Sequence, residues 1–219
     1  MAHELRTPVA EIRAIAEVTL SRTREQQDYQ QALGDIADTI KTLQGLIEKL
    51  LTLARLEAGQ VKPEVRAVAL QQVVDEQWGL VEPRAVARGV SFENGCSEDV
   101  VVAADPKLLD LVLANVLMNA ATYARRDSGV VDEGKRVGER WALSVLNEGC
   151  ALEEGEVERA FERFWRADAA RGGSGLHCGL GLTLVRRAME VMRGGAEADV
   201  DGEQRFRLTL TFPGVKSDE

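Results

Sequence analysis

The chain has 219 residues, of which 45% are hydrophobic, so it can bury the core of one large or two ordinary domains. Its formal net charge of −9 argues against nucleic acid or an anionic membrane surface as the main partner, because both favour a clustered basic face. No apolar run approaches the roughly 20 residues that a membrane-spanning helix needs, and no signal-peptide pattern is present. We therefore expect a soluble globular protein.

Two segments in the N-terminal part have the apolar spacing of amphipathic helices. Apolar or small residues recur at steps of three and four from Leu5 to Thr19, and again from Ile36 to Ala54. The short polar segment from Ser21 to Asp28 favours an antiparallel hairpin. Because one hairpin would leave much apolar seam exposed, we expect two copies to form a dimeric four-helix bundle. A coiled-coil spacer is the alternative.

After Gly59 the pattern changes to mixed helix and strand, so we divide the chain into domains at residues 1–59 and 60–219. The predicted helices of the second domain are Leu70–Arg88, Pro106–Arg125 capped by Asp105, most of Glu153–Trp165, and Leu180–Met192. The predicted strands are Val90–Glu93, Val100–Ala103, Trp141–Leu146 and Gln204–Phe212. This order favours an α+β two-layer sandwich with helices on one face of a mixed sheet. Residues 166–179 are predicted to form a lid.

The three cysteines, Cys96, Cys150 and Cys178, are far apart in the sequence. Their odd number and their spacing match neither a disulfide framework nor a zinc site. A reducing cytoplasm is the compartment that fits this cysteine usage.

The sequence HELRTP places His3 beside Glu4 and one helical turn before Thr7. At about 100° per residue, His3 lies nearly opposite the seam residue Leu5, so His3 and Thr7 share one exposed face. A zinc protease motif needs a second histidine where Thr7 stands, which excludes that class. A neutral imidazole is a nucleophile near pH 7, and Glu4 can hold its other ring nitrogen or take up its proton. A His-Glu pair with no chemical role is the alternative.

Polar and glycine-rich stretches in the second domain indicate a nucleotide site. Asn115 and Asn119 lie four residues apart on one predicted helical face, where two amide oxygens can coordinate Mg²⁺ carrying a triphosphate. Asn147 and Gly149 end a predicted strand, a position from which a side chain can contact an adenine edge. The sequence GGSGLHCGLGLTLV, residues 172–185, leads into an apolar helix whose first amides can hold phosphate. The alternatives are that the two asparagines of the helix only form its polar face, and that the stretch with Asn147 and Gly149 is an ordinary turn.

The series HELRTP, NVLMNAATYA, NEG, FERFWRAD and GLGLTLV resembles, in this order, the sequence boxes of sensor histidine kinases of two-component systems. The resemblance implies a dimerisation and histidine-phosphotransfer domain followed by an ATP-binding domain of the Bergerat type. It also implies that the histidine attacks the γ-phosphate of ATP and then passes the phosphoryl group to an aspartate on a response-regulator receiver domain.

The resemblance also implies roles for individual residues. His3 matches the phosphoacceptor, Glu4 its acid/base neighbour, and Thr7 the position that orients water in the regulator-phosphatase reaction. The positions that match the nucleotide and Mg²⁺ contacts are Asn115 and Asn119 for the metal, and Tyr123, Asn147, Gly149, Arg166, Gly179, Leu180 and Gly181 for ATP. Phe161 and Phe164 match the aromatic pair that anchors the lid.

Four positions depart from the family pattern. Asn147 stands where an aspartate usually reads the adenine amino group, and Thr122 stands where a lysine often contacts phosphate. Ala151 and His177 each replace a glycine. The departures motivate an alternative hypothesis, a degenerate signalling scaffold or phosphatase with weak ATP binding. An ATPase of the gyrase or chaperone group is a further alternative, although those enzymes usually carry an acid where this chain has Asn115.

The function expected from these observations is Mg²⁺-dependent and ATP-dependent histidine phosphorylation by a homodimer. We expect the chain to be the cytoplasmic part of a membrane-attached sensor.

Overall fold

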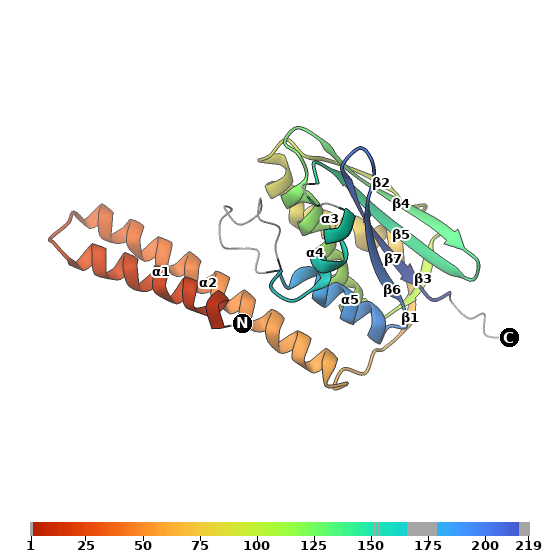
Figure 1. Cartoon of the computed structure of the whole chain (residues 1–219), viewed down its shortest axis with the longest axis horizontal. Helices are drawn as coiled ribbons and strands as arrows, with labels where there is room; N and C mark the ends of the chain where they lie inside the picture. Colours follow the sequence, from red (N-terminus) through yellow and green to blue (C-terminus); the bar gives the residue numbers. More distant parts are fainter. Residues whose placement is uncertain (1, 151, 153, 166–178, 215–219) are drawn as a thin grey trace.

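The computed structural model of the chain describes residues 2–150, 152, 154–165 and 179–214; within these ranges the side chains of residues 2–4 and 154 are not described. Two helices, α1 (Ala2–Leu20) and α2 (Gln26–Glu57), form an antiparallel hairpin that projects from a mixed α/β domain (Figure 1). Helix α1 continues through Pro8. The predicted helical hairpin is thus confirmed.

A five-stranded sheet forms one layer of the domain. Its spatial order is β2 (Ser91–Gly95), β4 (Gly129–Val137), β5 (Arg140–Glu148), β7 (Arg205–Phe212) and β6 (Gly195–Val200). Strands β2 and β4 run parallel, and all other neighbours run antiparallel. A separate two-stranded sheet pairs β1 (Arg66–Ala69) with β3 (Val101–Ala104).

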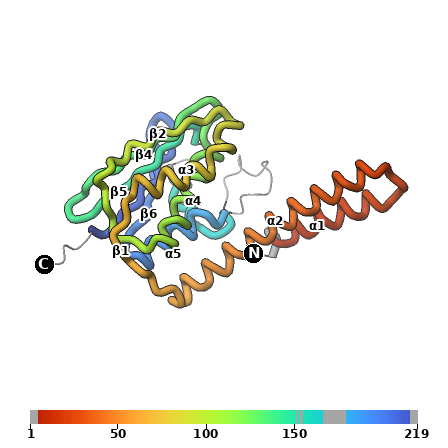
Figure 2. The backbone as a smooth tube through the Cα atoms, turned by 180° about the vertical axis from the view of Figure 1, so that it is seen from behind, coloured from red at the N-terminus to blue at the C-terminus, as the bar shows by residue number. Residues whose placement is uncertain are grey.

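Three helices form the second layer on one face of this sheet: α3 (Leu70–Val86), α4 (Pro106–Tyr123) and α5 (Gly181–Val191). The tube view from behind shows these helices along one side of the strands (Figure 2). Alternate residues of β7 from Phe206 to Phe212 are buried, which gives the sheet the apolar face that helices cover. The α+β two-layer sandwich with a mixed sheet is confirmed.

Asp105 connects the start of α4 to the segment that follows the hairpin. One carboxylate oxygen accepts a hydrogen bond from the Leu108 amide at 3.0 Å, which caps α4 as predicted. The other oxygen accepts from the Glu64 amide at 2.7 Å. One buried side chain therefore fixes both the site helix and the chain that enters the domain.

Four parts of the expected secondary structure differ from the structure. The strands β1, β4 and β6 were not predicted. The prediction that most of Glu153–Trp165 is helical is wrong for the described residues, which contain only the short 3-10 turns Glu154–Glu156 and Glu158–Phe161.

No described helix is both long enough and apolar enough to cross a membrane.

Candidate functional site

Helix α4 supplies the polar face on which the site is built. Its apolar face is fully or almost fully buried, as with Leu113 and Leu117, whereas Asn115 and Asn119 lie half-buried on another side of the helix. The hydroxyl oxygen of Thr122 is buried and has no hydrogen-bond partner within the described residues. A buried hydroxyl without a partner is costly, so Thr122 Oγ1 has hydrogen-bonding capacity that the described residues do not use.

Asn115 brings this face next to the start of α5. Its amide nitrogen donates to the carbonyl of Leu111 at 2.7 Å, which leaves the amide oxygen free to accept. That oxygen lies so close to Gly181 that a Cβ built there would be 3.3 Å from it. The predicted metal residue and a predicted phosphate-binding glycine are thus neighbours in space.

The start of α5 is held by the residues around Gly179. The amide of Phe164 donates to the carbonyl of Gly179 at 2.9 Å, so the two ends of the segment between them are joined. Gly179 adopts φ of +63°, and a Cβ there would lie 2.5 Å from the carbonyl oxygen of Trp165. Leu180, which precedes α5, is completely buried. Only glycine fits the backbone at position 179.

A polar network supports the Phe161 side of this junction. The hydroxyl of Thr183 on α5 donates to the carbonyl of Phe161 at 2.8 Å, and the buried Phe161 ring lies under the guanidinium of Arg186 at 3.7 Å. Arg186 also donates to Glu158 at 2.6 Å, and this hydrogen bond lowers the pKa of the Glu158 carboxyl. These contacts attach the 3-10 turn and the Phe161 ring to α5.

The end of β5 lies beside the C-terminal end of α4. Asn147 is only 3% exposed and pairs in register with Val130 on β4 and Phe206 on β7. Gly149 has φ of +84°, and a Cβ there would lie 2.8 Å from the Cβ of Arg125. The glycine therefore permits a close approach that no other residue allows.

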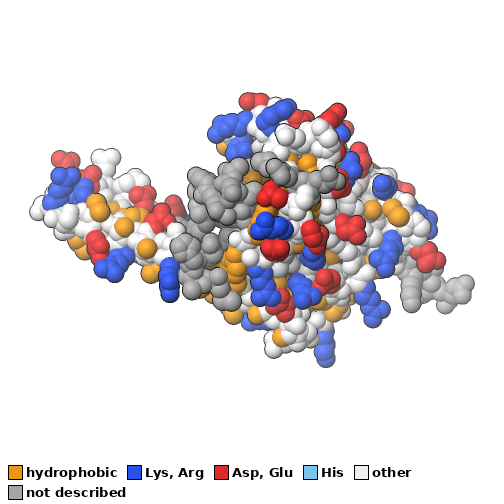
Figure 3. All heavy atoms as spheres, in the orientation of Figure 1, with side chains coloured by type: hydrophobic (Ala, Val, Ile, Leu, Met, Phe, Trp, Pro, Cys, Tyr) orange, Lys and Arg blue, Asp and Glu red, His pale blue; other side chains and the backbone are white. Residues whose placement is uncertain are grey.

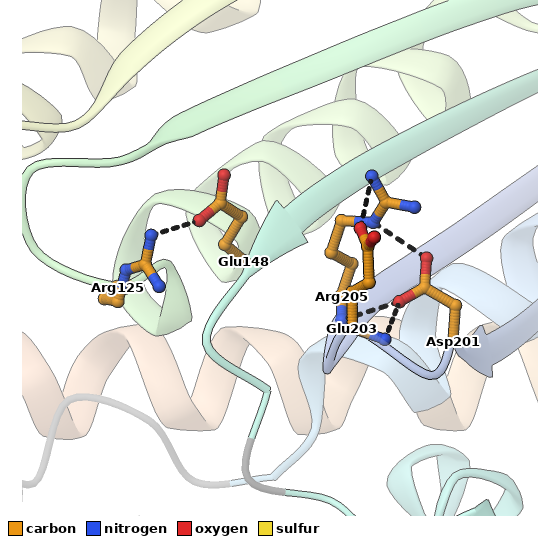
Figure 4. Close-up of polar contacts among 5 residues, drawn as sticks. All are labelled: Arg125, Glu148, Asp201, Glu203 and Arg205. Carbon is orange, nitrogen blue, oxygen red and sulfur yellow. Dashed lines mark hydrogen bonds and ion pairs between the residues drawn. The ribbon is translucent and has the colours of Figure 1, made fainter.

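Surface ion pairs and a backbone hydrogen bond lie at this end of the sheet. The side chain of Arg125, which follows α4, contacts that of Glu148 at 2.5 Å (Figure 4). The Arg125 amide also donates to the Glu148 carbonyl at 2.9 Å. On the neighbouring hairpin, Arg205 pairs with Asp201 at 2.8 Å and with Glu203 at 3.1 Å. The backbone around Asn147 is thus held from the side of α4.

The described residues of the expected site come from three elements that are far apart in sequence. Asn115, Asn119 and Tyr123 lie on α4, Asn147 and Gly149 at the end of β5, and Gly179, Leu180 and Gly181 at the start of α5. Tyr123 is 38% exposed at the last turn of α4. The structure brings Asn115 against Gly181, and β5 against α4.

Other expected residues cannot be placed in the same way. His3 and Glu4 belong to α1, but their side chains lie outside the described residues. Thr7 is an exposed residue of α1. Arg166, Ala151, His177 and most of the predicted lid lie outside the described residues. Sequence reasoning missed the unpartnered hydroxyl of Thr122 as a ligand candidate, although its position three residues after Asn119 was a signal.

Comparison with protein families gives two matches. Residues 1–59 match the His Kinase A (phospho-acceptor) domain, and residues 104–215 match the histidine kinase-, DNA gyrase B- and HSP90-like ATPase family. The second match alone covers more than half of the chain.

Individual proteins are similar over nearly the whole chain. Sensor protein IrlS of Burkholderia pseudomallei is 34% identical over 216 residues, which are 97% of this chain and 46% of IrlS. The structure of ShkA in complex with AMPPNP has a TM-score of 0.72 at 22% identity, over 98% of this chain and 45% of that one. The structure of histidine kinase ThkA in complex with response regulator protein TrrA has a TM-score of 0.76 at 19% identity, over 98% of this chain and 60% of that one. The chain thus spans about half the length of the curated relative.

Proposed function

Because this chain belongs to the sensor histidine kinases of two-component systems, we propose that it transfers the γ-phosphoryl group of ATP to His3 and then to a response-regulator aspartate. The observation that carries the proposal is the closeness of the Asn115 amide oxygen to Gly181. It puts an amide oxygen beside the first amides of a helix, an arrangement suited to a triphosphate with its metal ion.

The described residues fit Mg²⁺ and the phosphates. The amide oxygens of Asn119 and Asn115 would hold Mg²⁺, and the unpartnered hydroxyl of Thr122 lies one turn further along the same helix. When bound, Mg²⁺ neutralises charge on the phosphate oxygens. The backbone amides around Leu180 and Gly181 at the start of α5 would hold the phosphates. Asn147 and Gly149 would contact the adenine base, and Tyr123 and Arg166 would be further nucleotide contacts.

The phosphoryl step needs few groups from the protein. The unprotonated ring nitrogen of His3 attacks the γ-phosphorus, a nitrogen–phosphorus bond forms, and the bond to the β-phosphate oxygen breaks to release ADP. Glu4 holds the other ring nitrogen and takes up its proton. The receiver aspartate then accepts the phosphoryl group, and Thr7 orients water when the regulator is dephosphorylated.

We propose a homodimer as the active form. Apolar side chains remain exposed along the hairpin, including Val18, Leu33 and Ile40, and Figure 3 shows hydrophobic atoms on this arm between charged ones. A second hairpin would cover them in a four-helix bundle. A receiver domain is the proposed second partner, since the relative ThkA was solved with a response regulator protein. We also propose that the chain is the cytoplasmic part of a longer, membrane-attached sensor.

Labelling with γ-labelled ATP and Mg²⁺ tests the proposed reaction. We expect acid-labile and alkali-stable label on the wild-type chain and none on His3→Gln, because the nucleophile is missing. Glu11→Gln, an exposed change on the same helix, is the matched control and should keep the label. Label retained by His3→Gln would sink the proposal. Absence of calorimetric ATP binding would instead favour the scaffold alternative, which the comparisons do not favour.

A further inference from the structure

We propose that Asn147 lets the nucleotide site accept 6-oxopurine nucleotides such as inosine and guanosine triphosphate as well as ATP. The inference rests on the proposed function, since it takes the base to lie at the end of β5. It concerns which base edge the site can read, and it follows from the hydrogen-bonding state of one buried amide.

The Asn147 side chain is buried but poorly bonded. Asn147 is 3% exposed, and within the described residues the only hydrogen bond of its side chain runs to the Glu148 carbonyl at 3.5 Å. The nitrogen–oxygen distance of a good N–H···O hydrogen bond is shorter than this by about 0.3 Å or more. Buried amides are normally paired, so this amide has both an acceptor and donor capacity left for a ligand.

The backbone that carries Asn147 is fixed on both sides. Asn147 pairs within the sheet with strands β4 and β7, the amide of Arg125 donates to the carbonyl of Glu148 at 2.9 Å, and the Cys150 amide donates to the Gln204 carbonyl at 2.9 Å. The amide group itself can still rotate about its terminal torsion, which is broad and roughly two-fold. A half-turn exchanges the positions of the donor and the acceptor while the strand stays in place.

The two amide orientations match two kinds of purine edge. Adenine offers an N6–H donor beside the N1 acceptor, which pair with the amide oxygen and nitrogen of Asn147 respectively. Hypoxanthine and guanine offer an O6 acceptor beside an N1–H donor, which pair with the same amide after the half-turn. A carboxylate, in contrast, has only acceptors and repels O6. The residue that replaces the family aspartate therefore relaxes base selectivity.

Inosine triphosphate is the sharpest probe, because it differs from ATP at the read edge and lacks the 2-amino group of guanine. We expect calorimetric dissociation constants for ATP and ITP with Mg²⁺ to agree within about fivefold for the wild-type chain, since either edge makes two hydrogen bonds. In Asn147→Asp, ITP should bind about tenfold or more weaker than ATP, because O6 is left facing a carboxylate.

Gln60→Glu is the matched control, since it makes the same amide-to-carboxylate change at an exposed residue away from the end of β5. Its ATP-to-ITP ratio should equal that of the wild type. The ratio in the wild type alone decides the inference if Asn147→Asp does not fold. If the wild type binds ATP but its dissociation constant for ITP is thirtyfold or more higher, this inference is wrong and the kinase proposal stands. A factor of thirtyfold is on the order of the cost of one unpaired buried group. If neither nucleotide binds, both proposals are wrong.

Discussion

Gly179 combines a left-handed backbone with close backbone neighbours, so its substitution gives a specific prediction at the residue scale. In Gly179→Ala the new Cβ would lie 2.5 Å from the Trp165 oxygen and 2.8 Å from the Phe164 carbonyl carbon. Because backbone atoms cannot move aside cheaply, the hydrogen bond between Phe164 and Gly179 should break. We expect ATP affinity to fall by about tenfold or more in calorimetry, which corresponds to at least 1.4 kcal/mol.

The control for this prediction is Gly155→Ala. Gly155 lies in the short turn Glu154–Glu156, and a Cβ there would meet nothing within 4 Å. Its ATP affinity should match that of the wild type. Equal affinity for Gly179→Ala and wild type would show that the junction before α5 plays no part in nucleotide binding.

The buried carboxyl of Asp132 gives a prediction of how the stability of the domain depends on pH. It lies on β4 with no exposed surface; one oxygen accepts from the Gly95 amide at 2.7 Å, and the other has no partner within the described residues. Burial, with the nearby charge of Asp75 on α3 as a smaller cause, raises the pKa of the Asp132 carboxyl from 3.8 to about 6. The neighbouring Cys96 thiol has its pKa raised to about 11, mainly by burial, so it stays neutral.

The sign of the effect follows from proton binding. Between about pH 4 and pH 6 the folded chain binds more protons at Asp132 than the unfolded chain, so stability falls as pH rises through this window and then levels off. Asp132→Asn should remove this decline and raise the free energy of unfolding at pH 7.5 by about 1–3 kcal/mol. Urea titrations at pH 4.5, 6 and 7.5 measure it. Asp110→Asn, at an exposed residue, is the control and should follow the wild-type curve. A variant as pH-dependent as the wild type would contradict the assignment.

The site residues could be predicted from spacing only where the spacing is local. Asn115 and Asn119 were placed on one helical face because a turn separates them, and α4 confirms that face. The proximity of Asn115 to Gly181 depends on how α4 packs against α5, which no local pattern encodes. The poorly bonded state of Asn147 likewise depends on β4, β7 and the end of α4 together.

At the scale of elements, helices with long apolar periods were predictable and polar strands were not. The residues of β4 read GVVDEGKRV, in which only the first few residues are apolar. Strand β6 reads GAEADV, which alternates apolar and charged residues but consists mostly of residue types with low strand propensity. They are strands because β5 and β7 supply backbone partners along their length. The segment around Phe161 has helical spacing, yet it forms only short turns because its side chain and carbonyl are held by α5.

The hairpin gives the prediction at this scale. Ile40 and Ile47 lie one heptad apart on α2, and they remain 42% and 43% exposed in the single chain. If the dimer buries them, Ile47→Glu should place a charge in the seam between hairpins and weaken association by about 2 kcal/mol or more, roughly thirtyfold in the dimer dissociation constant. Sedimentation equilibrium measures it. Glu48→Lys, an exposed change at the next position, should leave the dimer unchanged. An unaltered dimer in Ile47→Glu would place the interface elsewhere.

At the scale of the whole molecule, the hairpin and the mixed α/β domain are joined by two kinds of contact. The C-terminal part of α2 packs against α5, and Leu53 and Leu56 are 2% and 4% exposed within the same core cluster as the domain. Glu57 at the end of α2 pairs with Arg163, and it lies 3.8 Å from Arg187 on α5. Arg163 directly precedes Phe164, so the charged contact reaches the junction that borders the site.

The two contacts should respond differently to salt, which gives a test of how the domains are held together. Charge pairs near the surface are worth about 0–1 kcal/mol and are screened at high ionic strength, where the Debye length falls to about 3 Å at 1 M. Loss of a buried leucine side chain costs about 2–5 kcal/mol and does not depend on screening. Glu57→Gln should therefore speed amide hydrogen exchange in α5 at low salt. Near 1 M NaCl the exchange rates of the wild type and of Glu57→Gln should be equal, because the ion pairs are screened in the wild type. Leu53→Ala should speed the same amides more strongly at both salt concentrations. Equal salt dependence of the two variants would show that the ion pairs do not hold α5 to the hairpin.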